Sequence, residues 1–178
     1  MTSYRKTELE LNKAFDPQSC RHIMEGNTVV LHCHHYATLY TQLAMDCGML
    51  DAKALMAECS EDTWEEFLRE YFRSRGVSSV RERIALAEQS YAAAGLGRMR
   101  VTCASPESGE VTLDHSHLDE GWIKKWGHYK SPVNFIGAGY ISALFSAVFD
   151  LPARSFAVTE AEAIVCGAPR SRFIVVAR

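Results

Sequence analysis

The chain has 178 residues, of which 47% are apolar and 23% charged, and its formal net charge is −3. These values are typical of one folded domain with its own core, and they disfavour nucleic-acid binding, which needs basic clusters. No apolar run reaches the ~18 residues that cross a bilayer, and the N-terminus lacks the apolar stretch of a secretory signal. The six cysteines are scattered, as is typical of reduced thiols. We therefore expect a cytoplasmic protein with no membrane or nucleic-acid partner.

Residues 1–95 are expected to be mainly helical. A short β-branched run at 28–31 is compatible with either a strand or a helix start. Apolar residues at helical spacing predict a helix over 36–47. Ser60 is expected to cap the next helix and Ser79 the one after it. Each of these helices carries one apolar stripe, which most simply packs against a core.

The periodicity changes at Gly97, where apolar and polar residues begin to alternate. This alternation predicts two strands joined by a turn, followed by a short helix over 118–126. A long helix is expected to open at Ser131-Pro132. Gly137 and Gly139 lie inside that helix, where a glycine costs about 1 kcal/mol relative to alanine, so we expect close packing or a ligand contact there.

The last residues, 155–176, predict a terminal hairpin around a turn at 167–169. Because the expected strands are joined by turns and not by crossover helices, we predict an α+β fold. It consists of an antiparallel sheet of about four strands with helices packed on one face. Residues 1–178 are expected to form one domain, with 1–95 as its helical part and 96–178 as the sheet, the long helix and the terminal hairpin.

The C-terminal third carries the motifs of a known family, in Ser131-Pro132-Val133-Asn134, Gly137-Ala138-Gly139 and the stretches 158–163 and 167–173. It resembles the 4-vinyl-reductase-like (hydrocarbon-binding) domain family. That family includes the sensor domain of phenol- and xylene-responsive activators and is related in fold to TRAPP vesicle-tethering subunits. The resemblance runs from about residue 117 to the end. It implies a pocket for an apolar or aromatic molecule between the helices and the sheet, and it is compatible with a homodimer.

The resemblance also concerns zinc, which some members hold with three cysteines and an acidic residue. The three cysteine positions are Asn134, Ala163 and Ser171 in this chain. Because zinc requires about four N, S or O donors and alanine provides none, we predict that the family zinc site is absent. Cys166 is not expected to replace a lost ligand, because it would face the other side of a strand.

Aromatic side chains are the expected lining of the implied pocket. The ligand-binding residues that we predict from the resemblance and the helical stripes are Trp64, Phe67, Phe135, Tyr140 and His128. Packing into a core is the ordinary alternative for the apolar ones.

Histidines dominate the segment His32-Cys33-His34-His35. In a strand His32 and His34 share a face, whereas in a helix His32 and His35 do. Either spacing suits two imidazole ligands of one divalent metal such as zinc, iron or copper. His32, His34 and His35 are therefore our candidate metal ligands, and His32 and His34 are candidate catalytic residues. Surface turns and helix starts also carry such runs without a ligand.

Two carboxylates, Glu160 and Glu162, alternate along one expected strand, so they point the same way. Glu160 could complete a metal shell and Glu162 could act as a general base. An ion pair with Arg154, Arg170 or Arg172 is the alternative.

Weaker signals are the pair His115 and His117 and a thiolate at Cys33, which neighbouring histidines would activate. The sequence contains no glycine-rich phosphate loop or dinucleotide fingerprint.

Three functions remain open after this reasoning. The chain could bind a small, largely apolar or aromatic molecule, act on one as a metal-dependent or acid–base enzyme, or serve as an assembly subunit. A metal on histidines would favour the enzyme. An apolar cavity without titratable groups would favour the binding domain, and a large apolar surface patch without a cavity would favour assembly.

Overall fold

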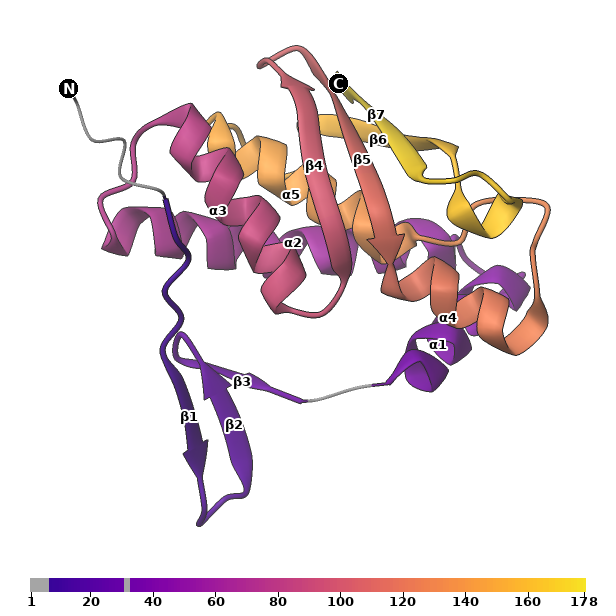
Figure 1. Ribbon diagram of the computed structural model, residues 1–178, viewed down its shortest axis with the longest axis horizontal. Helices are drawn as coiled ribbons and strands as arrows, with labels where there is room; N and C mark the ends of the chain where they lie inside the picture. Colours follow the sequence, from indigo (N-terminus) through magenta and orange to yellow (C-terminus); the bar gives the residue numbers. More distant parts are fainter. Residues whose placement is uncertain (1–6, 31–32) are drawn as a thin grey trace.

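The computed structural model describes residues 7–30 and 33–178 (Figure 1). Three short strands come first, followed by three helices, and the second half alternates strand pairs with helices. In chain order the elements are β1 (Lys13–Asp16), β2 (Arg21–Met24), β3 (Asn27–Val29), α1 (His34–Asp46), α2 (Ala52–Ser74), α3 (Val80–Ala93), β4 (Gly97–Ala104), β5 (Ser108–Ser116), α4 (His117–Trp126), α5 (Phe135–Val148), β6 (Phe156–Glu162), the 3-10 helix η1 (Ile164–Cys166) and β7 (Ser171–Ala177).

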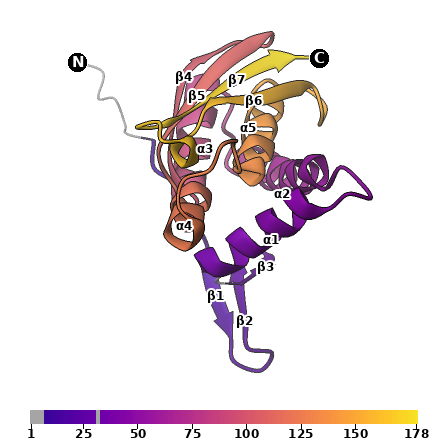
Figure 2. The ribbon, with the colours of Figure 1, turned by 90° about the vertical axis from the view of Figure 1, so that its right-hand side faces the viewer.

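The larger sheet has the strand order β4-β5-β7-β6, and all three neighbouring pairs are antiparallel. Figure 2 shows that α5 lies directly under this sheet and that α2 lies beyond α5. The helices thus cover one face of an antiparallel four-stranded sheet, which confirms the predicted α+β class. No helix in the described part of the chain is long and apolar enough to cross a membrane.

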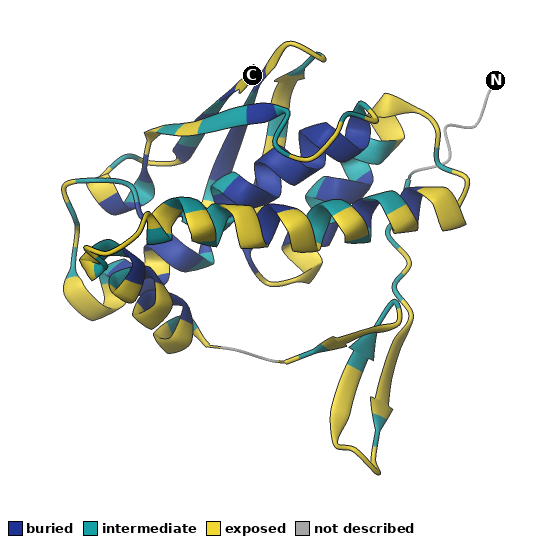
Figure 3. Ribbon diagram, turned by 180° about the vertical axis from the view of Figure 1, so that it is seen from behind, coloured by how far each residue is buried: buried dark blue, intermediate teal, exposed yellow. Residues whose placement is uncertain are grey.

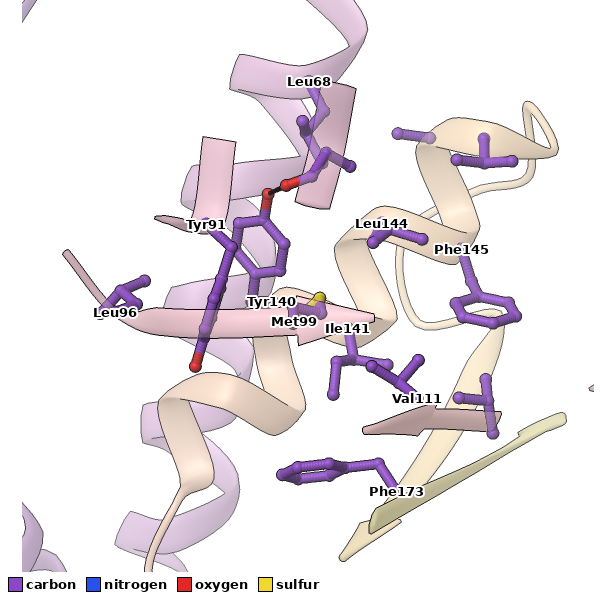
Figure 4. Close-up of a cluster of buried hydrophobic side chains, with 14 of the residues drawn as sticks. Leu68, Tyr91, Leu96, Met99, Val111, Tyr140, Ile141, Leu144, Phe145 and Phe173 are labelled. Atoms are coloured by element: carbon purple, nitrogen blue, oxygen red, sulfur yellow. Dashed lines mark hydrogen bonds between the residues drawn. The ribbon is translucent and has the colours of Figure 1, made fainter. Parts of the chain in front are cut away.

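The core lies between this sheet and the helices, and α5 is buried over nearly its whole length (Figure 3). The ring of Tyr140 packs edge-on between Trp64, at 4.9 Å, and Tyr91, at 4.8 Å, measured between ring centres. Its hydroxyl donates to the carbonyl of Ala87 at 2.6 Å. Figure 4 shows the rings of Tyr91 and Tyr140 among other buried side chains, including Val111 and Phe173 of the sheet. Side chains therefore occupy the space between helices and sheet in which the resemblance implies a ligand.

The helices α2 and α5 cross at very short range at Gly139. A Cβ atom at Gly139 would lie 2.0 Å from the carbonyl oxygen of Ala57. Ser60 packs at the same crossing, and its hydroxyl donates to the carbonyl of Ile136 at 2.8 Å. The prediction that Ser60 caps a helix is therefore wrong. The helix begins eight residues earlier in the sequence, at Ala52, where the Asp51 carboxylate accepts from the amide of Ala54 at 3.1 Å.

Two further boundaries differ from the prediction. The long helix begins at Phe135 and not at Ser131-Pro132, because the Asn134 side chain caps it by accepting from the amide of Gly137 at 2.8 Å. Cys166 lies in the 3-10 helix η1 and is exposed, so its expected place on a strand is also wrong. The short helix and the terminal hairpin lie where the sequence predicts them.

A small antiparallel sheet of β1, β2 and β3 projects from the body below α2 (Figure 1). Sequence patterning does not predict β1 and β2, because their residues are mostly polar and exposed. Glu25 at its inner end accepts from the amide of Asn12 at 2.6 Å and lies 3.6 Å from the guanidinium of Arg75. These contacts connect the small sheet to the end of α2.

Candidate functional site

An apolar hollow, which we term the helix groove, runs between α1, α2 and the first turn of α5. Its volume is about 580 Å³, which falls within the ~300–1,000 Å³ range of small-molecule sites. It opens to the surface, so it differs from the enclosed pocket that the resemblance implies. Its apolar wall is formed mainly by Tyr40, Leu43, Leu55, Met56, Trp64 and Ile136.

The hydroxyl groups of Ser60 and Thr63 in the helix groove are already hydrogen-bonded within the protein. The Ser60 hydroxyl donates to the carbonyl of Ile136, and the Thr63 hydroxyl donates to the carbonyl of Cys59 at 2.9 Å. Among the described residues that line the groove there is no carboxylate, lysine, arginine or histidine. The groove therefore offers a bound molecule carbon and sulfur surface with little demand for hydrogen bonds.

A second hollow, which we term the hairpin cleft, lies between α2 and the β2–β3 hairpin. Its volume is about 660 Å³. Trp64 and Phe67, two of the predicted ligand-binding residues, line it together with Tyr71. Trp64 lines both hollows, whereas Phe67 lines only the hairpin cleft.

The other predicted ligand-binding residues line neither hollow. Tyr140 is fully buried in the core, and Phe135 is half-buried at the start of α5. A ring nitrogen of His128 lies 3.2 Å from the carbonyl oxygen of Val165.

The histidine segment lies at the start of α1, although His32 is outside the described residues. His34 packs against α4, where a Cβ atom at Gly121 would lie 2.8 Å from the His34 Cβ. Partial burial lowers the pKa of His34, and the charges of His35 and Lys124 lower it further. The rings of His34 and His35 are 4.1 Å apart, and Nδ1 of His35 lies 3.6 Å from the Cys33 thiol.

Within residues 7–30 and 33–178, no three histidine, cysteine, aspartate or glutamate side chains form a group that could hold a metal ion. Glu162 forms an ion pair with Arg172 at 2.8 Å on the exposed side of the sheet, as the alternative interpretation has it. A catalytic role for His32, His34 or Glu162, and a metal on His32, His34, His35 and Glu160, stay predictions.

The predicted zinc positions converge with other polar residues in a buried group that we term the carboxylate cluster. It consists of Ser116, Asp119, Asn134, Glu160 and Ser171. The Ser116 hydroxyl donates to the Asp119 carboxylate, which also accepts from the amide of Val165 at 3.2 Å. The Asn134 amide donates to the Ser116 hydroxyl at 3.1 Å. Asp119 was missed in the sequence, although Ser116-x-x-Asp119 is a helix-capping pattern that could have indicated it.

The cluster brings two carboxyl groups together at a place that water reaches poorly. Burial raises the pKa of Glu160 to about 8, and the charge of Asp119 adds to the effect. Burial also raises the pKa of Asp119. In the described part of the chain, one Glu160 oxygen, Oε1, has no hydrogen-bond partner, and no ion pair to either carboxylate is found.

The residues at the zinc positions do not fit zinc. The Asn134 oxygen already accepts from the amide of Gly137, and the Ser171 hydroxyl accepts from the amide of Ile164 at 3.1 Å. Ala163 supplies no donor at all. Hydrogen bonds within the protein thus replace the metal bonds that the resemblance implies at this place.

Comparison with known proteins finds similarity at the level of structure. No model of a protein family matches the chain, and no curated protein matches it. The phenol-responsive sensory domain of the transcription activator PoxR, solved with phenol, superposes with a TM-score of 0.77 at 17% identity over 93% of this chain and 84% of that one.

Two other solved structures share the arrangement less closely. A vinyl-4-reductase family protein from Methanocaldococcus jannaschii has a TM-score of 0.51 at 12% identity, over 81% of this chain and 77% of that one. A trafficking protein particle complex subunit 3 from Naegleria fowleri, covalently bound to palmitic acid, has a TM-score of 0.53 at 14% identity, over 82% and 94%. The relationships that the C-terminal motifs indicate are thereby confirmed: the chain has the fold that is shared by the phenol-sensor, vinyl-4-reductase and TRAPP proteins.

Proposed function

We propose that this chain, acting as a single domain, binds a small, largely apolar or aromatic molecule in the helix groove. The observation that carries the proposal is a hollow of about 580 Å³ whose wall is mainly apolar and whose Ser60 and Thr63 hydroxyls are already hydrogen-bonded. Such a wall gains free energy from covering apolar surface, at about 25 cal/mol per Å². The phenol-binding sensory domain with the same fold gives support for a small aromatic ligand.

Charge placed on the groove wall should abolish this binding. Leu43 and Leu55 line the groove but remain 58% and 49% exposed, so glutamate at either position leaves the core intact. We expect the double variant Leu43→Glu, Leu55→Glu to bind toluene at least about 10-fold more weakly than the wild-type chain, because a carboxylate in an apolar hollow must be desolvated. Titration calorimetry or ligand-observed NMR with toluene and phenol measures this.

The matched control is Val80→Glu, which adds the same charge to an apolar residue that is 43% exposed and lies outside the groove. Its affinity for toluene should equal that of the wild-type chain. Absence of saturable toluene binding in the wild-type chain, or an equal loss in the control, would rule out the helix groove as the site.

We also propose that the chain forms a homodimer through the apolar outer face of α1. Tyr36 and Leu39 are exposed on this helix, and Met49 and Leu50 are exposed directly after it. Several exposed apolar side chains on one helix and the turn after it are typical of an interface. Analytical ultracentrifugation should show a dimer that Leu39→Glu converts to a monomer, whereas Val80→Glu should remain dimeric. A monomeric wild-type chain would refute the interface.

A further inference from the structure

The floor of the hairpin cleft is a row of aromatic rings. Trp64, Phe67 and Tyr71 project from one face of α2, since residues three or four apart lie above one another on a helix. The Trp64 and Phe67 rings meet edge-on at 5.5 Å, and the Phe67 and Tyr71 rings stack at 6.1 Å. The β2–β3 hairpin forms the opposite wall, so the rings face the hairpin across a partly open cleft.

Among the residues of 7–30 and 33–178 that line the cleft, the charged side chains are all acidic. They are Glu25 from the hairpin and Glu66 and Glu70 from α2. Glu25 interacts with Arg75, and Glu70 interacts with Arg73. Glu66 is exposed and forms no ion pair in the described part of the chain. Nearby arginines therefore pair with Glu25 and Glu70, and the negative charge of Glu66 is left without an ion pair among the described residues.

Next to the cleft, the Tyr71 ring already contacts a cation, Arg75, which lines a neighbouring hollow. The guanidinium carbon of Arg75 lies 5.4 Å from the centre of the Tyr71 ring. The same guanidinium lies 3.5 Å from a carboxylate oxygen of Glu10 and 3.6 Å from one of Glu25. An aromatic face combined with carboxylates is a favourable environment for a positive charge, and a cation–π contact contributes about 0.5–2 kcal/mol.

We propose that the hairpin cleft binds a small organic cation, an ammonium group carried on an apolar or aromatic body. The ammonium would lie near Glu66 and Glu70, and its carbon body would pack on Trp64 and Phe67. A carbon body is required because Met24 and Val29 make the hairpin wall partly apolar. This site shares Trp64 and Thr63 with the helix groove but differs from it in having carboxylates in its lining, and it does not depend on the function proposed for the groove.

The test compares benzylammonium with benzyl alcohol, which has nearly the same shape but no charge. Titration calorimetry with the full chain should show benzylammonium binding about 10-fold more tightly than benzyl alcohol. In the double variant Glu66→Gln, Glu70→Gln this preference should fall to less than about 2-fold. Both glutamates are exposed, so the variant keeps the core unchanged.

Two further variants determine whether the preference for benzylammonium arises in the cleft. Glu107→Gln removes an exposed charge from the β4–β5 turn, outside the cleft, and should retain the preference for benzylammonium. The groove variant Leu43→Glu, Leu55→Glu should also retain it, whether or not the groove binds toluene. Equal affinities for the two compounds in the wild-type chain, no binding of benzylammonium, or an equal loss in Glu107→Gln would overturn the proposal.

Discussion

Alanine at Gly139 is expected to lower the free energy of unfolding by about 3 kcal/mol or more, a large share of the ~5–15 kcal/mol that stabilises a typical domain. The added methyl group would lie 2.0 Å from the carbonyl oxygen of Ala57 and 2.8 Å from the Cβ of Ser60. The first of these atoms is backbone, so no side-chain rotation can relieve the overlap. The helices α2 and α5 would have to separate, which breaks the hydrogen bond from Ser60 to Ile136 and opens the core around Tyr140.

Gly48→Ala is the matched control. A Cβ atom at Gly48 would have no atom within 4 Å, and the residue does not adopt the left-handed backbone that favours glycine. We expect its unfolding free energy to lie within about 0.5 kcal/mol of the wild-type value. Urea denaturation followed by circular dichroism compares the three proteins. A Gly139→Ala protein as stable as the wild-type chain would mean that α2 and α5 do not pack at the distance described.

The two helical glycines show how far sequence reasoning reaches. Their cost in a helix predicts close packing or a ligand contact, and close packing is what the structure has. Gly139 makes room for the backbone of α2, whereas Gly137 makes room for the Asn134 side chain, 2.5 Å from where a Cβ would lie. The sequence could not distinguish packing from ligand contact. The partners of Gly139, Ala57 and Ser60, are far away in the chain, and the partner of Gly137 is the capping side chain of Asn134.

The strands of the larger sheet could be predicted because their apolar residues alternate and their turns are short. The β1–β3 sheet could not be predicted, since it has no buried face to impose an alternation. The start of α2 was missed because the first turns are exposed and carry little periodicity, and Ser60 was misread as a cap for the same reason. Local signals therefore identify the elements that border the core better than those that lie outside it.

The candidate site shows the same limit. Trp64 and Phe67 were selected as part of a helical stripe, and that stripe borders both hollows because α2 is packed on two sides. The stripe alone could not show that Tyr140 is enclosed by Trp64 and Tyr91. Asp119 was missed because its partner Glu160 is 41 residues away in the chain, and only the tertiary fold brings the two carboxylates together.

Stability should decrease as pH rises from about 5 to about 9, because of the carboxylate cluster. Burial, and then the charge of Asp119, raise the pKa of Glu160 to about 8 from an ordinary value of 4.5. The groups that face this cluster from neighbouring elements are Tyr91 on α3 and Cys166 in η1. Burial raises the pKa of Cys166 as well. No basic side chain forms an ion pair with Glu160 in the described part of the chain to favour its ionised form.

The sign follows from proton linkage. Between pH 4.5 and about 8 the folded chain keeps a proton on Glu160, whereas the unfolded chain has released it. The folded state then binds more protons, so the contribution of Glu160 is fully present below pH 4.5 and is lost as pH rises through 8. At about 1.4 kcal/mol per pKa unit, the whole loss has an upper bound of about 5 kcal/mol.

Glu160→Gln isolates this contribution, because glutamine keeps the shape of the protonated side chain and cannot ionise. We expect the variant to unfold with nearly the wild-type free energy at pH 5 and to be more stable than the wild-type chain by several kcal/mol at pH 9. The control Glu162→Gln removes an exposed carboxylate that pairs with Arg172, so its effect should stay below about 1 kcal/mol and should not change over this pH range. Urea denaturation at a series of pH values gives all three curves. If the wild-type chain and Glu160→Gln show the same dependence on pH, Glu160 has the same pKa in the folded and unfolded states, and the proposed proton on Glu160 in the folded cluster is refuted.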